Sequence, residues 1–219
     1  MLGFPSITFP HKEHICPGCA EGKMTRSVFS ASDRRSAKPF NKIHMDLKAM
    51  PVCSYHGYNY FLIIFDDATS HSWTINLKQK SNASPAIQQF IAMVKTQYGL
   101  SIKEVQIDVG GEFKSQELTI FLRELRINIL TSVPHMHQQN GCTERFIYTV
   151  MDKAQAMHLD ACLPKNWWEF AVDCATHVYN HIPIQHHDWK TPFENLTRMK
   201  PDVTHLHVFR CGTYVFLPE

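Results

Sequence analysis

The chain has 219 residues, of which 44% are hydrophobic and 11% aromatic, and its formal net charge is +2. This length and composition are enough for one domain with a hydrophobic core and a short appendage, and they exclude wholesale disorder. The nearly neutral charge does not by itself indicate a nucleic-acid partner, and no apolar run is long enough to predict a membrane span.

The first predicted segment, residues 1–38, combines a Cys-x-x-Cys pair with a basic, Ser-rich linker. Cys16 and Cys19 can supply two thiolates to a tetrahedral Zn²⁺, but a closed structural site needs four ligands. His11 and His14 precede the pair at an unusually short spacing, so an unmetallated knuckle is the alternative. The linker, residues 22–42, holds six Lys or Arg residues and one acid. It either lies along phosphates or is simply solvated.

Residues 39–182 are predicted to form the main domain, which begins as a sheet. Three runs of β-branched and aromatic residues, 43–50, 58–65 and 71–77, predict successive strands. Asp66 and Asp67 between the last two have the composition of a tight turn, which we favour over a metal role. A helix follows from Asn82 or Ser84 to about residue 98. Its predicted core face comprises Ile87, Phe90, Ile91 and Val94.

Strands at 103–108 and 127–131 then alternate with a helix at 115–125, and longer helices follow at about 140–159 and 165–181. This order predicts a mixed α/β sheet with an antiparallel meander at its start and parallel crossovers after it. The Trp167-Trp168 pair is interpreted as core and packing surface rather than as a base-stacking platform. Residues 183–219 form a further segment after this domain.

The seven cysteines are an odd number, which favours free thiols in a reducing, intracellular compartment. We expect Cys162, Cys174 and Cys211 to be small core residues.

Three acids occupy positions that suggest a shared site. Asp46 lies inside the first strand, Asp108 ends the fourth strand ahead of two glycines, and Glu144 lies one turn into a helix. Acids placed in this way can converge on divalent metal ions, which position a water or hydroxyl for attack on a phosphodiester. Taken singly, Asp108 is more simply a turn residue, and Glu144 with Arg145 a surface charge pair. The combination of all three favours the metal site.

These motifs resemble a known family. Asp46, Asp108-x-Gly-Gly-Glu112 and Gln139-Asn140-Gly141-x-x-Glu144-Arg145 are similar to the integrase core of copia-type LTR retrotransposons, a member of the ribonuclease-H-like superfamily. The resemblance extends from the Cys-x-x-Cys pair to Tyr214-Val215. It implies a ribonuclease-H-like, mixed five-stranded sheet flanked by helices, preceded by a zinc-knuckle remnant.

The resemblance also implies an activity, which is Mg²⁺- or Mn²⁺-dependent polynucleotidyl transfer that joins DNA 3′ ends. Asp46, Asp108 and Glu144 would be the catalytic metal ligands. Gln139, Asn140 and Arg145 would bind nucleic acid, and Cys16 with Cys19 would supply half of a Zn²⁺ site. The implied partners are DNA, with RNA as a further candidate, and other copies of the chain when active. No membrane is involved, and the place of action is the nucleus after a cytoplasmic stage.

The chain departs from the family pattern beside these acids. Val109 stands where the family usually has Asn, and Phe146-Ile147-Tyr148 replaces a polar stretch that faces DNA. The hypothesis is therefore a decayed or truncated copy that binds Mg²⁺ but binds DNA weakly. The alternatives are a non-catalytic nucleic-acid-binding relic of the same fold and a zinc-dependent interaction module.

Overall fold

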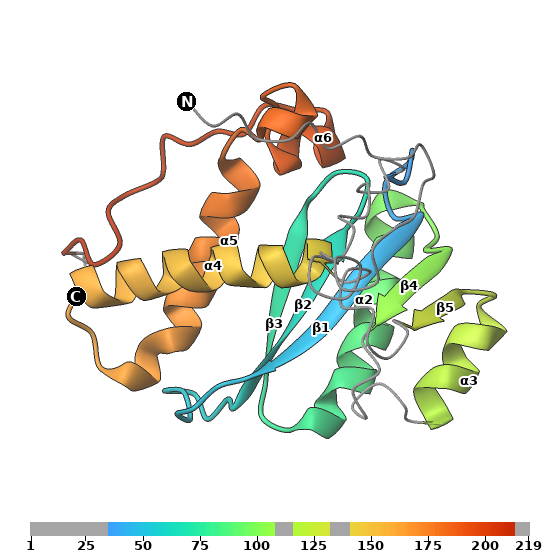
Figure 1. Cartoon of the computed structure of the whole chain (residues 1–219), viewed down its shortest axis with the longest axis horizontal. Helices are drawn as coiled ribbons and strands as arrows, with labels where there is room; N and C mark the ends of the chain where they lie inside the picture. Colours follow the sequence, from blue (N-terminus) through green and yellow to red (C-terminus); the bar gives the residue numbers. More distant parts are fainter. Residues whose placement is uncertain (1–34, 108–115, 132–140, 213–219) are drawn as a thin grey trace, which may run out of the picture. The chain divides into compact units, whose positions relative to one another are not determined.

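A single mixed sheet with the strand order β3-β2-β1-β4-β5 organises the chain (Figure 1). The computed structural model describes residues 35–107, 116–131 and 141–212, with the side chains of 141–144 excepted. Strands β1 (Lys42–Ala49), β2 (Tyr60–Asp66) and β3 (Ser72–Leu77) pair antiparallel, whereas β4 (Glu104–Ile107) and β5 (Asn128–Thr131) continue the sheet in parallel. The predicted meander followed by parallel crossovers is confirmed.

Helices connect the strands and follow them in the predicted order. They are η1 (Lys80–Asn82), α2 (Ala83–Tyr98), α3 (Gln116–Glu124), α4 (Gly141–Asp160), η4 (Lys165–Trp167), α5 (Trp168–His181), η5 (Gln185–His187) and α6 (Pro192–Thr197). The helix predicted from residue 165 therefore begins as a 3₁₀ turn. None of the described helices has the length and apolar character needed to cross a membrane.

The alternating side chains of β2 belong to two hydrophobic cores, one on each face of the sheet. Leu62 and Ile64 pack in the core that includes α2 and α3. Phe61, Ile63 and Phe65 pack in the core that includes α4 and α5. A strand buried on both faces needs a continuous apolar run, which is the pattern that β2 shows. The sheet is therefore covered by α2 and α3 on one face and by α4 and α5 on the other.

Helix α2 agrees with its prediction at both ends and along its core face. Its predicted face of four apolar residues is buried, and Gly99 ends the helix with a left-handed φ of 64°, a conformation that glycine adopts without strain. Asn82 is the N-cap residue by position. Its side chain, however, accepts a hydrogen bond from the backbone N–H of Gln79 rather than from the helix.

The cysteine expectation is wrong at two of three positions. Cys162 and Cys211 are exposed and only Cys174 is half-buried, because the first two lie in the turn after α4 and in the segment after α6 rather than on a core face.

The two neighbouring tryptophans differ in burial. Trp168 is buried and its Nε1 donates to Val52 O at 2.8 Å, whereas Trp167 is 36% exposed.

The sequence patterns did not predict α6. Its first turn has a Thr-Pro signature in which the Thr191 hydroxyl accepts the backbone N–H of Glu194 at 3.0 Å, and Pro192 occupies the first helical position. This arrangement satisfies one of the donors that a helix start leaves unpaired. The part of the chain after α5 therefore has a helix of its own.

Candidate active site

Asp46 lies near the middle of β1, the central strand of the sheet. Ile43 and Met45 belong to the core on the α2 side, so Asp46 projects to the opposite face, because successive side chains of a strand alternate. Its register partner on β2 is Ile63, a residue of the core formed with α4 and α5. Asp46 is half-buried, and its Oδ1 accepts the backbone N–H of Leu47 at 2.8 Å. A carboxylate is thus fixed on the α4 face of the most central strand.

The predicted partner Asp108 follows the last residue of β4 directly. β4 runs parallel to β1, and the last pair in their register is Met45 with Ile107. Asp46 is the next residue of β1 after this pair, and Asp108 is the next residue of the sequence after the end of β4. Asp108 itself lies outside the described residues, so the structure gives its place in the chain and not its side chain.

Glu144 is the fourth residue of α4, and its side chain also lies outside the described part of the chain. The helix that holds it packs on the face of the sheet to which Asp46 projects, and it contacts β1 directly. Phe146 fixes this packing because its ring lies 5.2 Å from the ring of Phe65 on β2 and 4.7 Å from that of Tyr179 on α5. The structure therefore brings the helix of Glu144 to the strand of Asp46.

The first turns of α4 correct one expectation about nucleic-acid contacts. Phe146 and Ile147 are buried at 3% and 9% exposure, so these two positions face the core and are not lost DNA-facing positions. Arg145 and Tyr148 are exposed. The predicted contacts Gln139 and Asn140 lie outside the described residues. Among the described residues of this region, Arg145 is thus the predicted contact that is available to phosphates.

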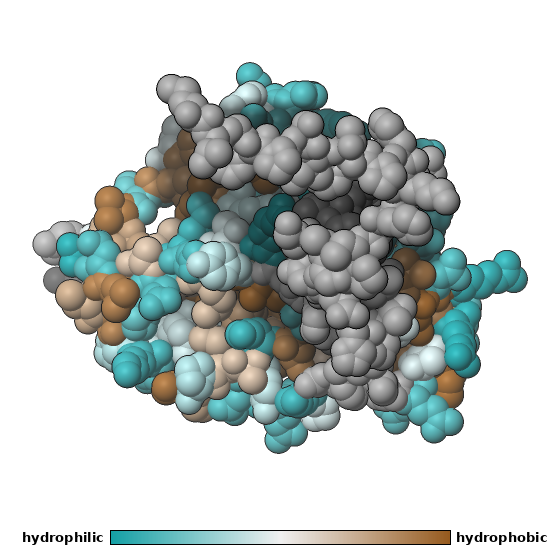
Figure 2. Space-filling model, viewed as in Figure 1, coloured by the Kyte–Doolittle hydropathy of each residue, from teal (hydrophilic) through white to brown (hydrophobic). Residues whose placement is uncertain are grey.

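The surface on this side of the molecule mixes hydrophilic and hydrophobic residues. Figure 2 shows teal and brown residues interspersed over the part of the face that the structure describes. The net charge of the chain is only +2. Contacts with a phosphate backbone would therefore depend on individual side chains such as Arg145.

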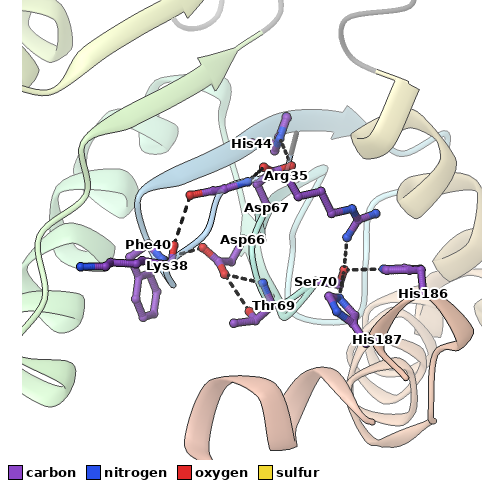
Figure 3. A network of polar contacts seen from close by, with 11 residues as sticks. Arg35, Lys38, Phe40, His44, Asp66, Asp67, Thr69, Ser70, His186 and His187 are labelled. Atoms are coloured by element: carbon purple, nitrogen blue, oxygen red, sulfur yellow. Dashed lines mark hydrogen bonds and ion pairs between the residues drawn. The ribbon is translucent and has the colours of Figure 1, made fainter. Parts of the chain in front are cut away.

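Asp66 is the last residue of β2 and Asp67 begins the predicted turn that follows, and both side chains are buried (Figure 3). Asp66 Oδ1 accepts the backbone N–H of Phe40 at 2.7 Å. Its Oδ2 accepts the N–H and the hydroxyl of Thr69 at 2.9 and 2.7 Å. These bonds tie the turn to the residues that lead into β1, so the turn interpretation is confirmed.

Asp67 ties a second segment to the same turn. Its Oδ2 accepts the backbone N–H of Ser36 at 2.7 Å, and its Oδ1 lies 3.2 Å from Nε2 of the buried His44. His44 lies two residues before Asp46 on β1 and projects to the same face, because alternate side chains of a strand share a face. The polar lining of this face therefore includes a His-Asp pair beside the candidate catalytic acid.

The two neighbouring carboxyl groups have opposite pKa shifts. Burial raises the pKa of Asp66, and its hydrogen bonds offset this only in part. Burial also acts to raise the pKa of Asp67. The hydrogen bonds from His44 and Ser36, together with the charges of His44 and Lys42, outweigh burial, so the pKa of Asp67 lies below its usual value. The difference follows from which charged or polar groups face each carboxylate.

A cluster around Ser70 was not found by reasoning from the sequence. The Ser70 hydroxyl accepts a hydrogen bond from Arg35 Nη1 at 2.7 Å and lies 3.2 and 2.8 Å from Nε2 of His186 and His187 (Figure 3). Burial, followed by the charges of His186 and Arg35, lowers the pKa of His187 to about 4. These residues come from three distant segments, and only the fold brings them together.

Most of the predicted metal ligands are residues whose side chains the structure does not describe. Cys16 and Cys19, the predicted zinc ligands, lie outside the described residues. Within residues 35–107, 116–131 and 141–212, no three His, Cys, Asp or Glu side chains gather in a way that could hold a metal ion. That finding does not bear on the acid triad, because Asp108 and the side chain of Glu144 are not described.

Comparison with known families and proteins gives a consistent result. Residues 36–137 match the family model of the integrase core domain. The chain is 30% identical over 213 residues to the retrovirus-related Pol polyprotein from transposon RE2 of Arabidopsis thaliana, covering 97% of this chain and 14% of that protein. It is 30% identical over 205 residues to the corresponding polyprotein from transposon TNT 1-94 of Nicotiana tabacum, covering 93% and 15%. The chain thus spans only 14–15% of the length of these curated relatives.

Solved structures show the same fold. The cryo-electron microscopy structure of the simian T-cell lymphotropic virus intasome in complex with PP2A regulatory subunit B56 gamma superposes with a TM-score of 0.61 at 18% identity, over 85% of this chain and 63% of that chain. The HTLV-2 integrase catalytic core domain in complex with magnesium, in a trimeric form, gives 0.55 at 18% identity, over 72% and 97%. At these identities the likeness shows the fold, which is the ribonuclease-H-like fold predicted from the sequence.

Proposed function

Because this chain is an integrase core of the retrotransposon type, we propose that it performs Mg²⁺-dependent polynucleotidyl transfer. In this reaction a DNA 3′ hydroxyl attacks a phosphodiester of the target strand, a new phosphodiester forms, and the 3′ oxygen of the target strand leaves. Asp46, Asp108 and Glu144 are the proposed metal ligands. The chain spans 14% of a related Pol polyprotein, so we infer that it acts as part of a longer protein or after release from one.

The observation that supports this proposal most strongly is the register between β1 and β4. The two strands are parallel and paired up to Met45 and Ile107, and neighbouring strands lie about 4.8 Å apart. If the register continues by one residue, Asp46 and Asp108 lie side by side on the same face of the sheet. Two carboxylates at that separation can share a pair of divalent ions about 4 Å apart.

The position of α4 supports the third ligand. The helix packs on the face to which Asp46 projects, contacts β1, and includes Glu144 in its first turns. Burial of Phe146 and Ile147 fixes the rotation of this part of the helix. An acid on a helix end, unlike one in a strand, can adjust its reach when substrate arrives.

The donor chemistry of this set fits magnesium. Carboxylate oxygens are the ligands that Mg²⁺ and Mn²⁺ prefer, and Mg²⁺ retains several waters, so few protein ligands suffice. Asp46 is only half-buried, which leaves it accessible to an ion from solvent. When bound, Mg²⁺ would supply the charge neutralisation that phosphoryl transfer requires.

The residues of the chain contribute position and rigidity. Asp46 is fixed by its place in the central strand and by the hydrogen bond from Leu47 N–H, so its carboxylate needs little reorganisation before reaction. Arg145, exposed next to Glu144, would bind a DNA phosphate and orient the strand. Proper orientation of the reacting groups accounts for a large part of the rate in such reactions.

The proposed partners follow from the same assignment. The superposed relatives include an intasome and a trimeric catalytic core, which supports assembly of several copies on DNA. We propose that this chain binds DNA ends as an oligomer and acts in the nucleus.

A strand-transfer assay tests the proposal. A labelled DNA duplex with a free 3′ hydroxyl is incubated with supercoiled plasmid and the chain in Mg²⁺ or Mn²⁺, and covalent joining is measured. Asp46→Asn preserves the shape and the acceptor for Leu47 N–H but removes the charge. We expect it to reduce joining by about 100-fold or more, since loss of even an outer partner of a metal site commonly costs 10–100-fold.

Asp152→Asn is the matched control, because it removes the charge of an exposed acid on α4. Joining at the wild-type rate is expected for this variant. If wild type and Asp46→Asn join DNA equally, and both proteins are folded, the catalytic assignment is refuted.

The non-catalytic nucleic-acid-binding relic remains the second candidate, and the surface of α4 favours it. In the first turns of this helix, Arg145 is the basic side chain that is described and exposed, with Tyr148 beside it. Few phosphate contacts imply weak DNA affinity with a shallow salt dependence. Salt-dependent DNA binding without joining in either metal would establish this reading instead.

A further inference from the structure

The connection between β1 and β2, residues 50–59, lies against the start of α5 and holds an exposed group of aromatic rings (Figure 1). Tyr55 is 61% exposed and Trp167 is 36% exposed. Their ring centroids are 5.7 Å apart, and the half-buried ring of Phe170 lies 5.3 Å from that of Trp167. The exposed ring of His56 meets Tyr55 edge to face at 5.1 Å. These residues form one aromatic cluster that is open to solvent.

Hydrogen bonds hold the aromatic cluster in place before any partner binds. The backbone N–H of Tyr55 donates to Asn166 O at 2.7 Å. The carboxylate of Glu169, only 2% exposed, accepts the backbone N–H of His56 at 3.1 Å and lies 3.0 Å from its Nδ1. Because the connection is already ordered, a ligand that contacts the rings causes little loss of conformational entropy in the protein.

Exposed lysines lie around the aromatic cluster. Lys165 is in the 3₁₀ turn η4, which leads into α5. Lys78 lies against the β1–β2 connection, since a Cβ atom at Gly57 would be 4.0 Å from Lys78 Cε. Lys48 lies two residues after Asp46 on β1 and shares its face of the sheet. All three lysines are exposed, and none forms an ion pair with a described carboxylate. Their positive charge is therefore available to an anionic partner.

The acids of the neighbouring helices are engaged by other groups. Asp173, one turn beyond the buried acid of the cluster on α5, accepts hydrogen bonds from Thr74 Oγ1 at 3.2 Å and Asn76 Nδ2 at 3.0 Å. Asp160, at the end of α4, lies 3.8 Å from Arg210 Nε. The lysines around the cluster therefore dominate what an anion meets at this surface.

We propose that the aromatic cluster and the three lysines bind single-stranded nucleic acid, with unpaired bases stacked on Tyr55 and Trp167 and phosphates held by the lysines. Every base has a π-face, so such stacking tolerates any sequence, and a basic surface follows the backbone. This gives Trp167 a role other than the packing interpreted from the sequence, whereas Trp168 is buried.

Lys48 connects this surface with the proposed active site. It lies about 7 Å beyond Asp46 along β1, because each residue of a strand advances by 3.2–3.4 Å. The surface therefore holds the unpaired stretch of a DNA strand that enters or leaves the active site. The direction of the strand rests on the proposed function, whereas the binding itself does not require catalysis.

Fluorescence anisotropy in the presence of EDTA measures this binding without metal ions. The full chain is titrated into a labelled oligothymidine of about 12 nucleotides, and into a duplex of the same length, at several salt concentrations. Tyr55→Ala and Trp167→Ala should each weaken single-strand binding about tenfold. Their salt dependence should not change, because neither substitution removes a charge. Lys165→Ala should instead reduce the slope of log affinity against log salt by about 0.7.

Trp189→Ala and Lys190→Ala are the matched controls, because they remove an exposed tryptophan and an exposed lysine from the segment after α5. Each should change single-strand affinity by less than about twofold, since neither residue belongs to the stacking surface. Tyr55→Phe and Trp167→Phe keep a ring in place and should retain most of the affinity. Thermal unfolding of every variant separates lost stacking from lost folding.

Single-strand binding that survives both alanine variants, or that falls equally in Trp189→Ala, would overturn the proposal. An equal loss of duplex binding would overturn the assignment to single strands. If Tyr55→Ala and Trp167→Ala instead reduce self-association in sedimentation and leave DNA binding intact, the cluster is a contact between copies of the chain. The joining assay with Asp46→Asn tests the active site separately, so failure of the one proposal is distinguishable from failure of the other.

Discussion

Asp46 and Asp66 lie on neighbouring antiparallel strands, β1 and β2, but their surroundings differ. Asp66 is fully buried and accepts hydrogen bonds from Phe40 and Thr69. Asp46 is half-buried at mid-strand, and the N–H of its own neighbour Leu47 bonds to one of its oxygens. One carboxylate closes a turn inside the protein, and the other stands on a face that solvent can reach.

This difference separates a structural acid from a candidate catalytic one. Asp66 with Asp67 is the more conspicuous acidic motif in the sequence, but its oxygens are engaged by the backbone around the turn. A metal-binding carboxylate must instead be held in place and remain accessible to an ion. Position in the sheet, rather than local density of acids, distinguishes the two.

The comparison predicts, first, that replacing the two acids affects different properties. Asp66→Ala leaves the N–H of Phe40 and both donors of Thr69 without their acceptor. Buried unpaired groups cost about 1–3 kcal/mol each, and the cost of burying the carboxylate itself offsets part of this. We expect a loss of roughly 3 kcal/mol in the free energy of unfolding, measured by urea denaturation.

Asp46→Asn is the counterpart in the same experiment, with an expected change within about 1 kcal/mol. A loss for Asp46→Asn as large as that for Asp66→Ala would show that Asp46 is itself structural. The distinction between the two acids would then disappear.

The second prediction concerns the buried His71 and the pH dependence of the free energy of unfolding. His71 follows the turn, and burial together with the charge of His181 lowers its pKa from 6.5 to about 3. Because the unfolded chain binds a proton near pH 6.5 and the folded chain does not, stability is complete above pH 6.5 and falls as the pH decreases toward 3. The slope is about 1.4 kcal/mol per pH unit at most.

Chemical denaturation between pH 7 and pH 4.5 measures this slope, and His71→Phe should flatten it. The ring of His71 lies 4.4 Å from that of Trp73, so an aromatic replacement retains packing. An unchanged slope in His71→Phe would mean that other groups govern the acid sensitivity.

The third prediction uses the opposite pKa shifts of the paired acids. The pKa of Asp67 lies below its ordinary value of 3.8, so its contribution is present above pH 3.8 and is lost as the pH falls through the folded-state value. Asp67→Asn should therefore cost roughly 1 kcal/mol at pH 7, and less as the pH approaches 3.

Asp66 should show the reverse, since burial raises its pKa. Asp66 holds its proton to a higher pH in the folded chain than in the unfolded chain. As the pH rises through this interval, the unfolded chain loses the proton first, so the Asp66 carboxyl lowers the free energy of unfolding. Thermal unfolding of Asp67→Asn and Asp66→Asn at pH 7 and pH 3 distinguishes the two cases. The same pH trend in both variants would contradict the assignment of the shifts.

The smallest expected effect concerns the solvent-facing side of the active-site face. Arg145→Ala should weaken DNA binding by a few-fold and lower the slope of log affinity against log salt by about 1, because one phosphate contact is lost. Fluorescence anisotropy with a labelled duplex at several salt concentrations measures both quantities. Lys153→Ala, further along α4, is the control, and an equal effect there would indicate non-specific charge attraction.

Local patterns predicted the elements of the fold well. The β-branched run of β2 and the apolar spacing of α2 required only neighbouring residues, and both elements formed as predicted. Positions that depend on which face an element presents were less predictable. Phe146 and Ile147 were interpreted as sites of lost DNA contacts but pack in the core, because the rotation of α4 is set by Phe65 and Tyr179 from other elements.

The sequence by itself determined the family, the order of the five strands and of helices α2 to α5, the turn at Asp66 and the three acids proposed to share metal ions, because each of these depends on a short run of residues. Only the tertiary structure decided that β1 and β4 are adjacent and parallel, that the Asp66 carboxylate accepts from Phe40, and that His177 meets His205. Those outcomes depend on contacts between residues far apart in the chain. Such contacts are fixed when the hydrophobic faces of all the elements are buried together, which no single stretch of sequence specifies.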